Sequence, residues 1–184
     1  MSNGNGFGIA WRDSRSARPQ IGFRELDATG QPRGEEKLLA AGLEDVTSSS
    51  LAWTGSGYAI GWLAGAYQVA LLDAAGNAVK GPRSVPSVKG NAHSLIGPTL
   101  GWHDGWLGVA YPWLDKTLPT ERRQLVFVEL DADLEPSSAP IEVPQGLDGA
   151  SGIQPSLVPT PEGYMITWAG APAYGIFATT ISCR

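Results

Sequence analysis

A glycine-led strand motif recurs four times along this chain of 184 residues. Each copy is a glycine followed by an alternating apolar strand that ends in an aromatic residue, and the copies begin at Gly6, Gly57, Gly105 and Gly163. They lie roughly 50 residues apart, a period typical of β-propeller blades and related β arrays. The repetition predicts an all-β fold, a propeller or part of one, built of about four antiparallel blades with four strands each.

The clearest copy of the unit runs from Leu51 to Val85 and reads as four strands, A to D. Its turns contain glycine, which supplies the positive φ that tight hairpins need. At the end of the C strand stands Asp27, Asp73 or Asp131, which can accept backbone N–H bonds in the following turn. The units are predicted over residues 1–46, 47–92, 93–150 and 151–184 of a single domain, with the first A strand and the last D strand missing.

Composition supports short strands and excludes several classes of function. Gly 24 and Pro 14, with 17% charged residues, suit strands and tight turns better than helices. The net charge of −5 and the lack of a basic stripe argue against a nucleic-acid partner. A single cysteine, Cys183, excludes an intrachain disulfide and a cysteine zinc site. No apolar run is long enough to span a membrane, and the first residues, as written, are no signal peptide.

The repeat also resembles a known kind of protein. A glycine, an aromatic residue, alternating aliphatic residues and a tryptophan, followed by a strand ending in Leu-Asp-x-x-Gly, resemble the degenerate propeller-like repeats of large secreted or lipid-anchored proteins of myxobacteria and related bacteria. The chain departs from the WD type, since no Trp-Asp ends a strand, and from calcium-binding FG-GAP blades, since Leu134 replaces their turn glycine. The resemblance implies adhesion or scaffolding, a secreted or cell-surface parent protein and no catalytic residues.

Three kinds of catalytic chemistry have candidate residues, and each has a simpler explanation in the repeat. His93 and His103 would hold a metal or form an acid/base pair only if they converged, which their spacing does not require. Ser56 stands in a recurring hairpin turn, whereas a nucleophile elbow joins a strand to a helix. Paired carboxylates could hydrolyse glycosides, but the candidates lie in predicted loops and the inner A strands carry no acid. These candidates are Glu44, Asp45, Asp104, Asp115 and Glu121.

Tryptophans are the most informative side chains. Those that end B strands, with a tyrosine in the same place, are predicted to pack between blades: Trp11, Trp62, Trp168 and Tyr111. Trp53 and Trp102 share an A-strand position, and Trp106 is predicted to replace the aromatic residue found at Phe7, Tyr58 and Tyr164.

Trp113 falls outside the repeat, in an insertion over residues 112–123 between the B and C strands of the third unit. Together with Asp115, Arg122 and Arg123 it is predicted to form a ligand-recognition patch, the alternative being local packing of the loop.

These observations predict a non-catalytic binding or assembly module, not an enzyme, without a cofactor or metal. Exposed strand edges in the incomplete first and last units predict that blades are completed within one chain or by a second copy. The predicted partner is therefore the chain itself, or a protein or glycan ligand. Two alternatives stay open: a propeller lectin that stacks sugars on tryptophan, and a glycoside hydrolase.

Overall fold

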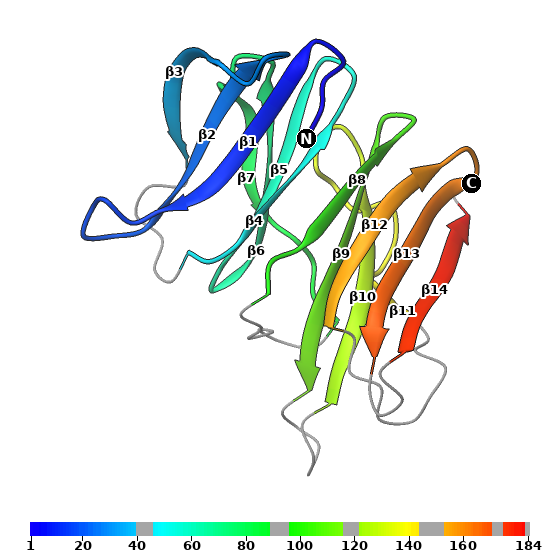
Figure 1. Ribbon diagram of the computed structural model, residues 1–184. Coiled ribbons are helices and arrows are strands. Elements are labelled where there is room, and N and C mark those ends of the chain that lie inside the picture. The colour runs from blue at the N-terminus through cyan, green and yellow to red at the C-terminus, as the bar shows by residue number, and fades with distance from the viewer. Residues whose placement is uncertain (40–45, 89–95, 116–121, 144–152, 171–174, 183–184) are drawn as a thin grey trace.

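The computed structural model shows four antiparallel β-sheets placed one after another along the chain (Figure 1). It describes residues 1–39, 46–88, 96–115, 122–143, 153–170 and 175–182. Every regular element of these residues is a strand, so the prediction of an all-β fold is confirmed. In the described part of the chain, no helix is long and apolar enough to cross a membrane.

Within each sheet the strands follow chain order, and neighbours pair antiparallel. Sheet 1 contains β1 (Gly6–Asp13), β2 (Gln20–Asp27) and β3 (Pro32–Leu39). Sheet 2 contains β4 (Ser49–Trp53), β5 (Gly57–Ala64), β6 (Ala66–Asp73) and β7 (Ala78–Ser84). Sheet 3 contains β8 (Thr99–His103), β9 (Trp106–Asp115), β10 (Arg122–Leu130) and β11 (Ile141–Val143). Sheet 4 contains β12 (Ile153–Thr160), β13 (Gly163–Gly170) and β14 (Gly175–Ser182).

The two middle sheets have the four strands that the repeat predicts, whereas sheets 1 and 4 have three each. In sheet 1 the place of the A strand is taken by a single bridge from Ser2 to Phe7. In sheet 4 the strand order ends at β14, the C strand of the unit. The sheets of three, four, four and three strands match the prediction of four repeat units in which the first A strand and the last D strand are missing.

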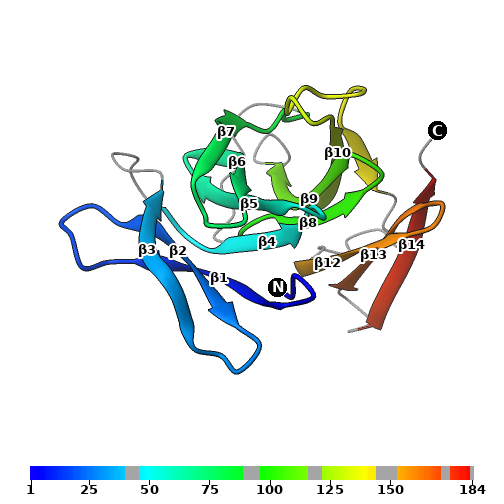
Figure 2. The ribbon, with the colours of Figure 1, turned by 90° about the horizontal axis from the view of Figure 1, so that it is seen from above.

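The sheets are arranged as an arc around their inner strands. The inner strands β4, β8 and β12 contact one another in chain order, and β1 contacts β4. Seen from above, sheets 1 and 4 stand at the two ends of this arc (Figure 2). Inner strands that share an axis, with the other strands of each sheet stepping outward, define a propeller-like architecture.

The turn between the C and D strands has the same hydrogen bonds in the first three sheets. In sheet 2, the Asp73 carboxylate accepts the backbone N–H of Asn77 at 2.8 Å, and the Gly76 N–H donates to the Asp73 carbonyl at 3.0 Å. Gly30, Gly76 and Leu134 occupy equivalent places, and all three have positive φ. These contacts confirm the predicted role of the aspartates, and they show that Leu134 adopts a conformation that favours glycine.

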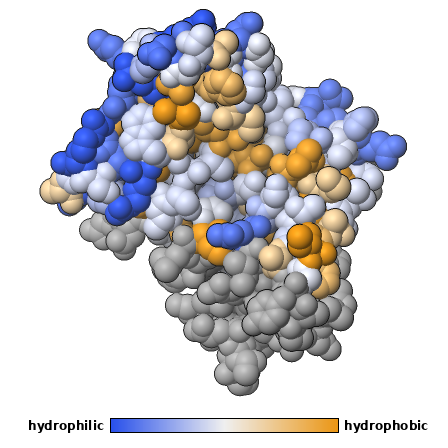
Figure 3. Space-filling view, in the orientation of Figure 1, coloured by the Kyte–Doolittle hydropathy of each residue, from blue (hydrophilic) through white to orange (hydrophobic). Residues whose placement is uncertain are grey.

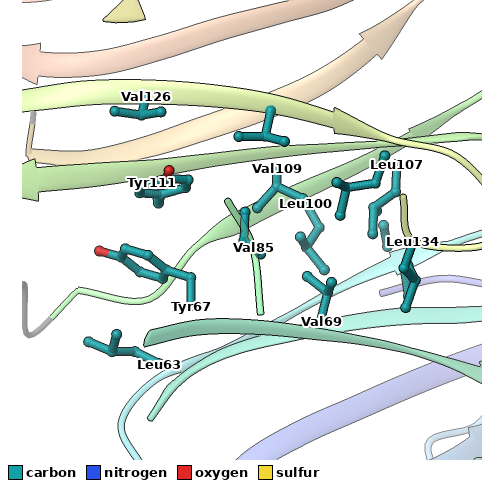
Figure 4. Close-up of a cluster of buried hydrophobic side chains, with 14 of the residues drawn as sticks. Leu63, Tyr67, Val69, Val85, Leu100, Leu107, Val109, Tyr111, Val126 and Leu134 are labelled. Atoms are coloured by element: carbon teal, nitrogen blue, oxygen red, sulfur yellow. The ribbon is translucent and has the colours of Figure 1, made fainter. Parts of the chain in front are cut away.

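One packing rule joins consecutive sheets. The B strand turns three alternate bulky side chains toward the preceding sheet, and in β5 these are Tyr58, Ile60 and Trp62, each at most 1% exposed. The equivalent residues of the later sheets are also buried: Leu107, Val109 and Tyr111 in β9, and Tyr164, Ile166 and Trp168 in β13. The prediction that these aromatic residues pack between blades is therefore confirmed for Trp62, Trp168 and Tyr111. Trp11 is only partly buried, because no described sheet precedes sheet 1. Figure 4 shows the cluster between sheets 2 and 3.

Glycine in the preceding sheet makes room for the bulky residues. A Cβ atom on Gly8 would lie 2.5 Å from the ring of Tyr58, and one on Gly108 would lie 2.7 Å from the ring of Tyr164. Contacts this short do not occur, so a side chain at either position would force the tyrosine ring to shift. The small residues of the alternating pattern therefore determine how closely the sheets approach.

Candidate functional site

A cavity of about 510 Å³ opens between sheets 3 and 4, at the end of the sheets that carries the A–B and C–D turns. Its volume lies within the range of pockets that hold small ligands. Aromatic and aliphatic side chains line it together with one carboxylate and several hydroxyl groups: Trp106, Phe127, Glu129, Ser137, Ser138, Ile141, Ile181 and Ser182. An apolar wall with a few polar groups is the usual composition of a ligand site.

Strand register explains why Trp106 faces this cavity. In β9 the residues Leu107 and Val109 turn toward sheet 2, so Trp106, one position earlier, turns toward sheet 4. The register also corrects a sequence prediction. Leu107 pairs with Trp102 just as Tyr58 pairs with Trp53, so Leu107, and not Trp106, replaces the recurring aromatic residue.

Trp106 instead occupies a position where the other three sheets have glycine: Gly6, Gly57 and Gly163. At Gly57 a Cβ atom would lie 2.1 Å from the Leu72 carbonyl oxygen, so the backbone there is too close for a side chain. Sheet 3 departs from this pattern and places a partly exposed indole at the mouth of the cavity. The hydroxyl of Tyr164 donates to the Trp106 carbonyl at 3.0 Å and links the tryptophan to sheet 4.

Glu129, on β10, is the carboxylate of the cavity. The strand pairs Glu129 with Gly108, which places it on the same face of sheet 3 as the buried Phe127. The Ser137 hydroxyl donates to Glu129 Oε2 at 3.2 Å, and the Ser137 N–H donates to the Glu129 carbonyl at 3.0 Å. These bonds tie the C–D turn to β10 and hold the carboxylate at the cavity wall.

The other two interfaces fill the corresponding space with the turn of the following sheet. Between sheets 1 and 2, Gly76 lies against the ring of Phe23. Between sheets 2 and 3, Leu134 is 1% exposed and belongs to the core cluster. At the interface of sheets 3 and 4, Trp106 and Glu129 line the opening. Trp106 is thus the cavity residue at which sheet 3 departs from the repeat.

The predicted recognition patch is placed differently from the expectation. Trp113 belongs to β9 and is 2% exposed, so its ring packs in the core between sheets 2 and 3 and offers no face to a ligand. Pro112 to Asp115 continue β9, and Arg122 and Arg123 begin β10, where Arg122 pairs with Asp115. The loop is therefore a β-hairpin at its base. The side chains of Asp115, Arg122 and Arg123 lie outside the described residues, and their role stays a prediction.

The remaining sequence candidates do not converge in the described structure. His103 ends β8, and its ring lies edge-on to Tyr164 with a centroid distance of 5.9 Å, while His93 lies outside the described residues. Ser56 is exposed in the A–B hairpin turn. Of the candidate carboxylates only Asp104 has a described side chain, also in an A–B turn. In the part of the chain described, no group of three or more His, Cys, Asp or Glu could hold a metal.

Sequence reasoning missed Trp106 and Glu129 as neighbours of one cavity. The signal for Trp106 was its place directly before Leu107, one residue earlier in the strand than the recurring aromatic position of Phe7, Tyr58 and Tyr164. For Trp113, the alternation of Leu107, Val109 and Tyr111 continues through Pro112 and predicts a buried position. For Glu129 the sequence held no signal, because its neighbours across the cavity come from sheet 4.

Comparisons with known proteins address the fold. No protein-family model matches this chain, and no curated protein matches it. Among solved structures, the GH43 endo-arabinanase from Bacillus licheniformis is similar, with a TM-score of 0.54 at 12% sequence identity. The similarity covers 97% of this chain and 70% of the arabinanase. That enzyme is a five-bladed β-propeller, so the comparison supports a propeller-like fold for this chain.

This comparison overturns the predicted function. A non-catalytic binding or assembly module was expected, whereas the similar fold is that of a glycoside hydrolase. The same finding points against the prediction that the chain is not an enzyme. At 12% identity the similarity establishes the fold alone, and it transfers no catalytic residue. The predicted membership of a myxobacterial-type repeat family and the predicted homo-oligomer stay predictions.

Proposed function

We propose that this chain is a carbohydrate-active propeller of the glycoside hydrolase type, and that it binds a polysaccharide in the cavity between sheets 3 and 4. The observation that carries this proposal is the convergence of Trp106 and Glu129 in a 510 Å³ cavity, at the place where sheet 3 departs from the repeat. The propeller-like fold shared with an endo-arabinanase supports the same class of substrate.

The chemistry of the cavity suits a sugar. A partly exposed indole offers an apolar face for the C–H groups of a pyranose or furanose ring, together with an N–H at its edge. The Glu129 carboxylate accepts hydrogen bonds from sugar hydroxyls, and the hydroxyls of Ser137 and Ser138 can both donate and accept. Phe127 and Ile181 form the apolar wall that excludes water from one side of the bound ring.

Hydrolysis of a glycoside would require a second carboxylate beside Glu129, one acting as acid and the other as base or nucleophile. Among the cavity-lining residues Glu129 is the one carboxylate. Glu129 therefore positions the glycan through hydrogen bonds, and a catalytic pair would need an acid from residues outside the described ranges.

The test is affinity electrophoresis of the full chain in gels that contain arabinan, arabinoxylan or xylan, with release of reducing ends measured in parallel. We expect at least one polymer to retard migration. Trp106→Ala should weaken binding about tenfold, which corresponds to about 1.4 kcal/mol, because the stacking face is lost. Glu129→Gln should weaken binding in the same direction, because the amide replaces an acceptor-only group.

Glu142→Gln is the matched control, because Glu142 is an exposed carboxylate on β11 that does not line the cavity. It should bind like the unchanged chain. Thermal unfolding of all variants verifies that they are folded. Absence of both retardation and reducing ends with every polymer contradicts the proposed function. Binding that Trp106→Ala and Glu129→Gln leave unchanged contradicts the site.

A further inference from the structure

Sheet 1 exposes a face that the other three sheets bury. Its β1 carries Phe7, Ile9 and Trp11 at the positions that hold Tyr58, Ile60 and Trp62 in β5, since Gly6 pairs with Asp27 as Gly57 pairs with Asp73. Phe7 is 42% exposed and Ile9 is 40% exposed, whereas Tyr58 and Ile60 are both 0% exposed. Figure 3 shows apolar residues gathered over β1 on this side of the molecule.

The opposite face of sheet 1 is already covered. Gly8 and Ala10 on that face pack against sheet 2, with Gly8 receiving the ring of Tyr58. In the other three sheets, the side chains at these positions pack against the preceding sheet. The exposed side chains of β1 therefore form one side of the same kind of interface, and the described residues contain no sheet for the other side. In each internal interface the bulky residues at these positions meet such a sheet, and at Gly8 and Gly108 the receiving residue is a glycine.

We propose that the face of β1 formed by Phe7, Ile9 and Trp11 is a docking surface for one further blade-like β-sheet, carried by polypeptide outside these 184 residues. The receiving strand of that sheet has glycine or alanine at the two positions that face Phe7 and Ile9. The sheet stands between sheet 4 and sheet 1 in the arc, where the five-bladed arabinanase has one blade more than the four sheets seen here.

A second copy of the chain is the competing occupant, and its residues do not match the surface. Its free face is the outer face of sheet 4, where Met165 and Thr167 stand at the positions of Gly108 and Ala110. A methionine there occupies the space that the aromatic ring at Phe7 needs, because even a Cβ atom on Gly108 would lie 2.7 Å from Tyr164. The pattern of small residues thus favours a different sheet over self-association.

The test uses the full chain with a copy of its own residues 97–143 fused ahead of Met1 through a Gly-Ser linker. This copy contains sheet 3, whose face with Gly108 and Ala110 receives the bulky residues of sheet 4 in the native chain. Hydroxyl-radical footprinting then reports the side-chain exposure of Phe7 and Trp11. We expect their modification to fall several-fold in the fusion, while that of the buried Trp62 stays unchanged.

Two controls make the outcome decisive. Gly108→Val in the fused copy alone should restore the exposure of Phe7, because a side chain then blocks the ring. In the original chain, Phe7→Ser should leave the unfolding temperature nearly unchanged, whereas Tyr58→Ser should lower it strongly. Unchanged modification of Phe7 in a folded fusion overturns the proposal. So does a loss of stability in Phe7→Ser equal to that of Tyr58→Ser, or a dimer of the original chain that Phe7→Ser abolishes.

Discussion

At the scale of single residues, Asp13 is the buried charge of the described structure, with 6% of its surface exposed. Its carboxylate accepts the Arg15 backbone N–H at 2.9 Å and is paired with the Arg15 guanidinium, which also contacts Glu36. The hydrogen bonds from Arg15 lower the pKa of Asp13 from its ordinary value of 3.8 to about 2. The ion pair compensates for removing the carboxylate from water at the end of β1.

A pH dependence follows from this shift. Because the folded-state pKa of Asp13 lies below the unfolded value, its contribution to stability is fully present above 3.8 and is lost as the pH falls toward 2. In thermal unfolding, Asp13→Asn should therefore be less stable than the unchanged chain at neutral pH, and the difference should shrink over that window. Arg15→Ala should show the same narrowing. If the difference in unfolding temperature between the unchanged chain and Asp13→Asn stayed constant from pH 7 to pH 2, the lowered pKa of Asp13 would be contradicted.

At the scale of elements, the C–D turn of sheet 3 fills space between sheets 2 and 3 with the side chain of Leu134. Leu134 is buried against sheet 2, and around it Lys80 pairs with Asp133 while Arg83 pairs with Glu135 at 2.5 Å. The equivalent residue in sheet 2 is Gly76, which has the same positive φ. The positive φ of Leu134 strains the backbone of this turn, and the burial of its side chain offsets that strain.

Substitutions at Leu134 should show both effects. Leu134→Ala removes a buried side chain and should cost about 2 to 4 kcal/mol of unfolding free energy. Leu134→Gly removes one carbon more but relieves the φ of 61°, so it should be as stable as Leu134→Ala or more stable. Urea unfolding measures both. A glycine variant less stable than the alanine variant by about 1 kcal/mol, as in an ordinary strand, would refute the strain.

At the scale of the whole molecule, the sheets differ in how many neighbours cover them. Sheets 2 and 3 are each packed between two other sheets, whereas sheets 1 and 4 each stand at an end of the arc (Figure 2). Burial on both faces raises the free energy needed to open a strand locally. The proposed docking surface belongs to sheet 1, and the proposed glycan cavity lies where sheet 4 meets sheet 3.

Hydrogen exchange should reveal this difference. Amide protons in β5 and β9, the B strands of the two middle sheets, should exchange about tenfold or more slowly than those in β2 and β13, which are central in the end sheets. Mass spectrometry of peptic fragments measures the four strands in one experiment. Equal protection in all of them would mean that the chain opens only as a whole, and that the end sheets are no weaker than the middle ones.

Most of the strands, their order and the C–D turns follow from the sequence alone, whereas the extension of β9 and β10 into the predicted insertion does not. Alternating apolar residues give the period of two, and Asp27, Asp73 and Asp131 mark the C–D turns, because these are local interactions within a few residues. The repeat likewise identified Trp62 and Trp168 as packing residues, since the same position recurs in successive units.

Which faces of the sheets are covered follows from the packing of the sheets and cannot be read from the sequence. Alternation shows that Phe7 and Tyr58 occupy the same position, but their exposure differs because only Tyr58 has a preceding sheet against it. Trp113 is buried for the same reason, because it packs against residues of sheet 2 such as Tyr67. The Tyr67 hydroxyl donates to the carbonyl of Pro112, 45 residues further along the chain, at 2.7 Å. Burial depends on neighbours that are distant in the sequence, and the cavity at Trp106 and Glu129 exists only where two sheets meet.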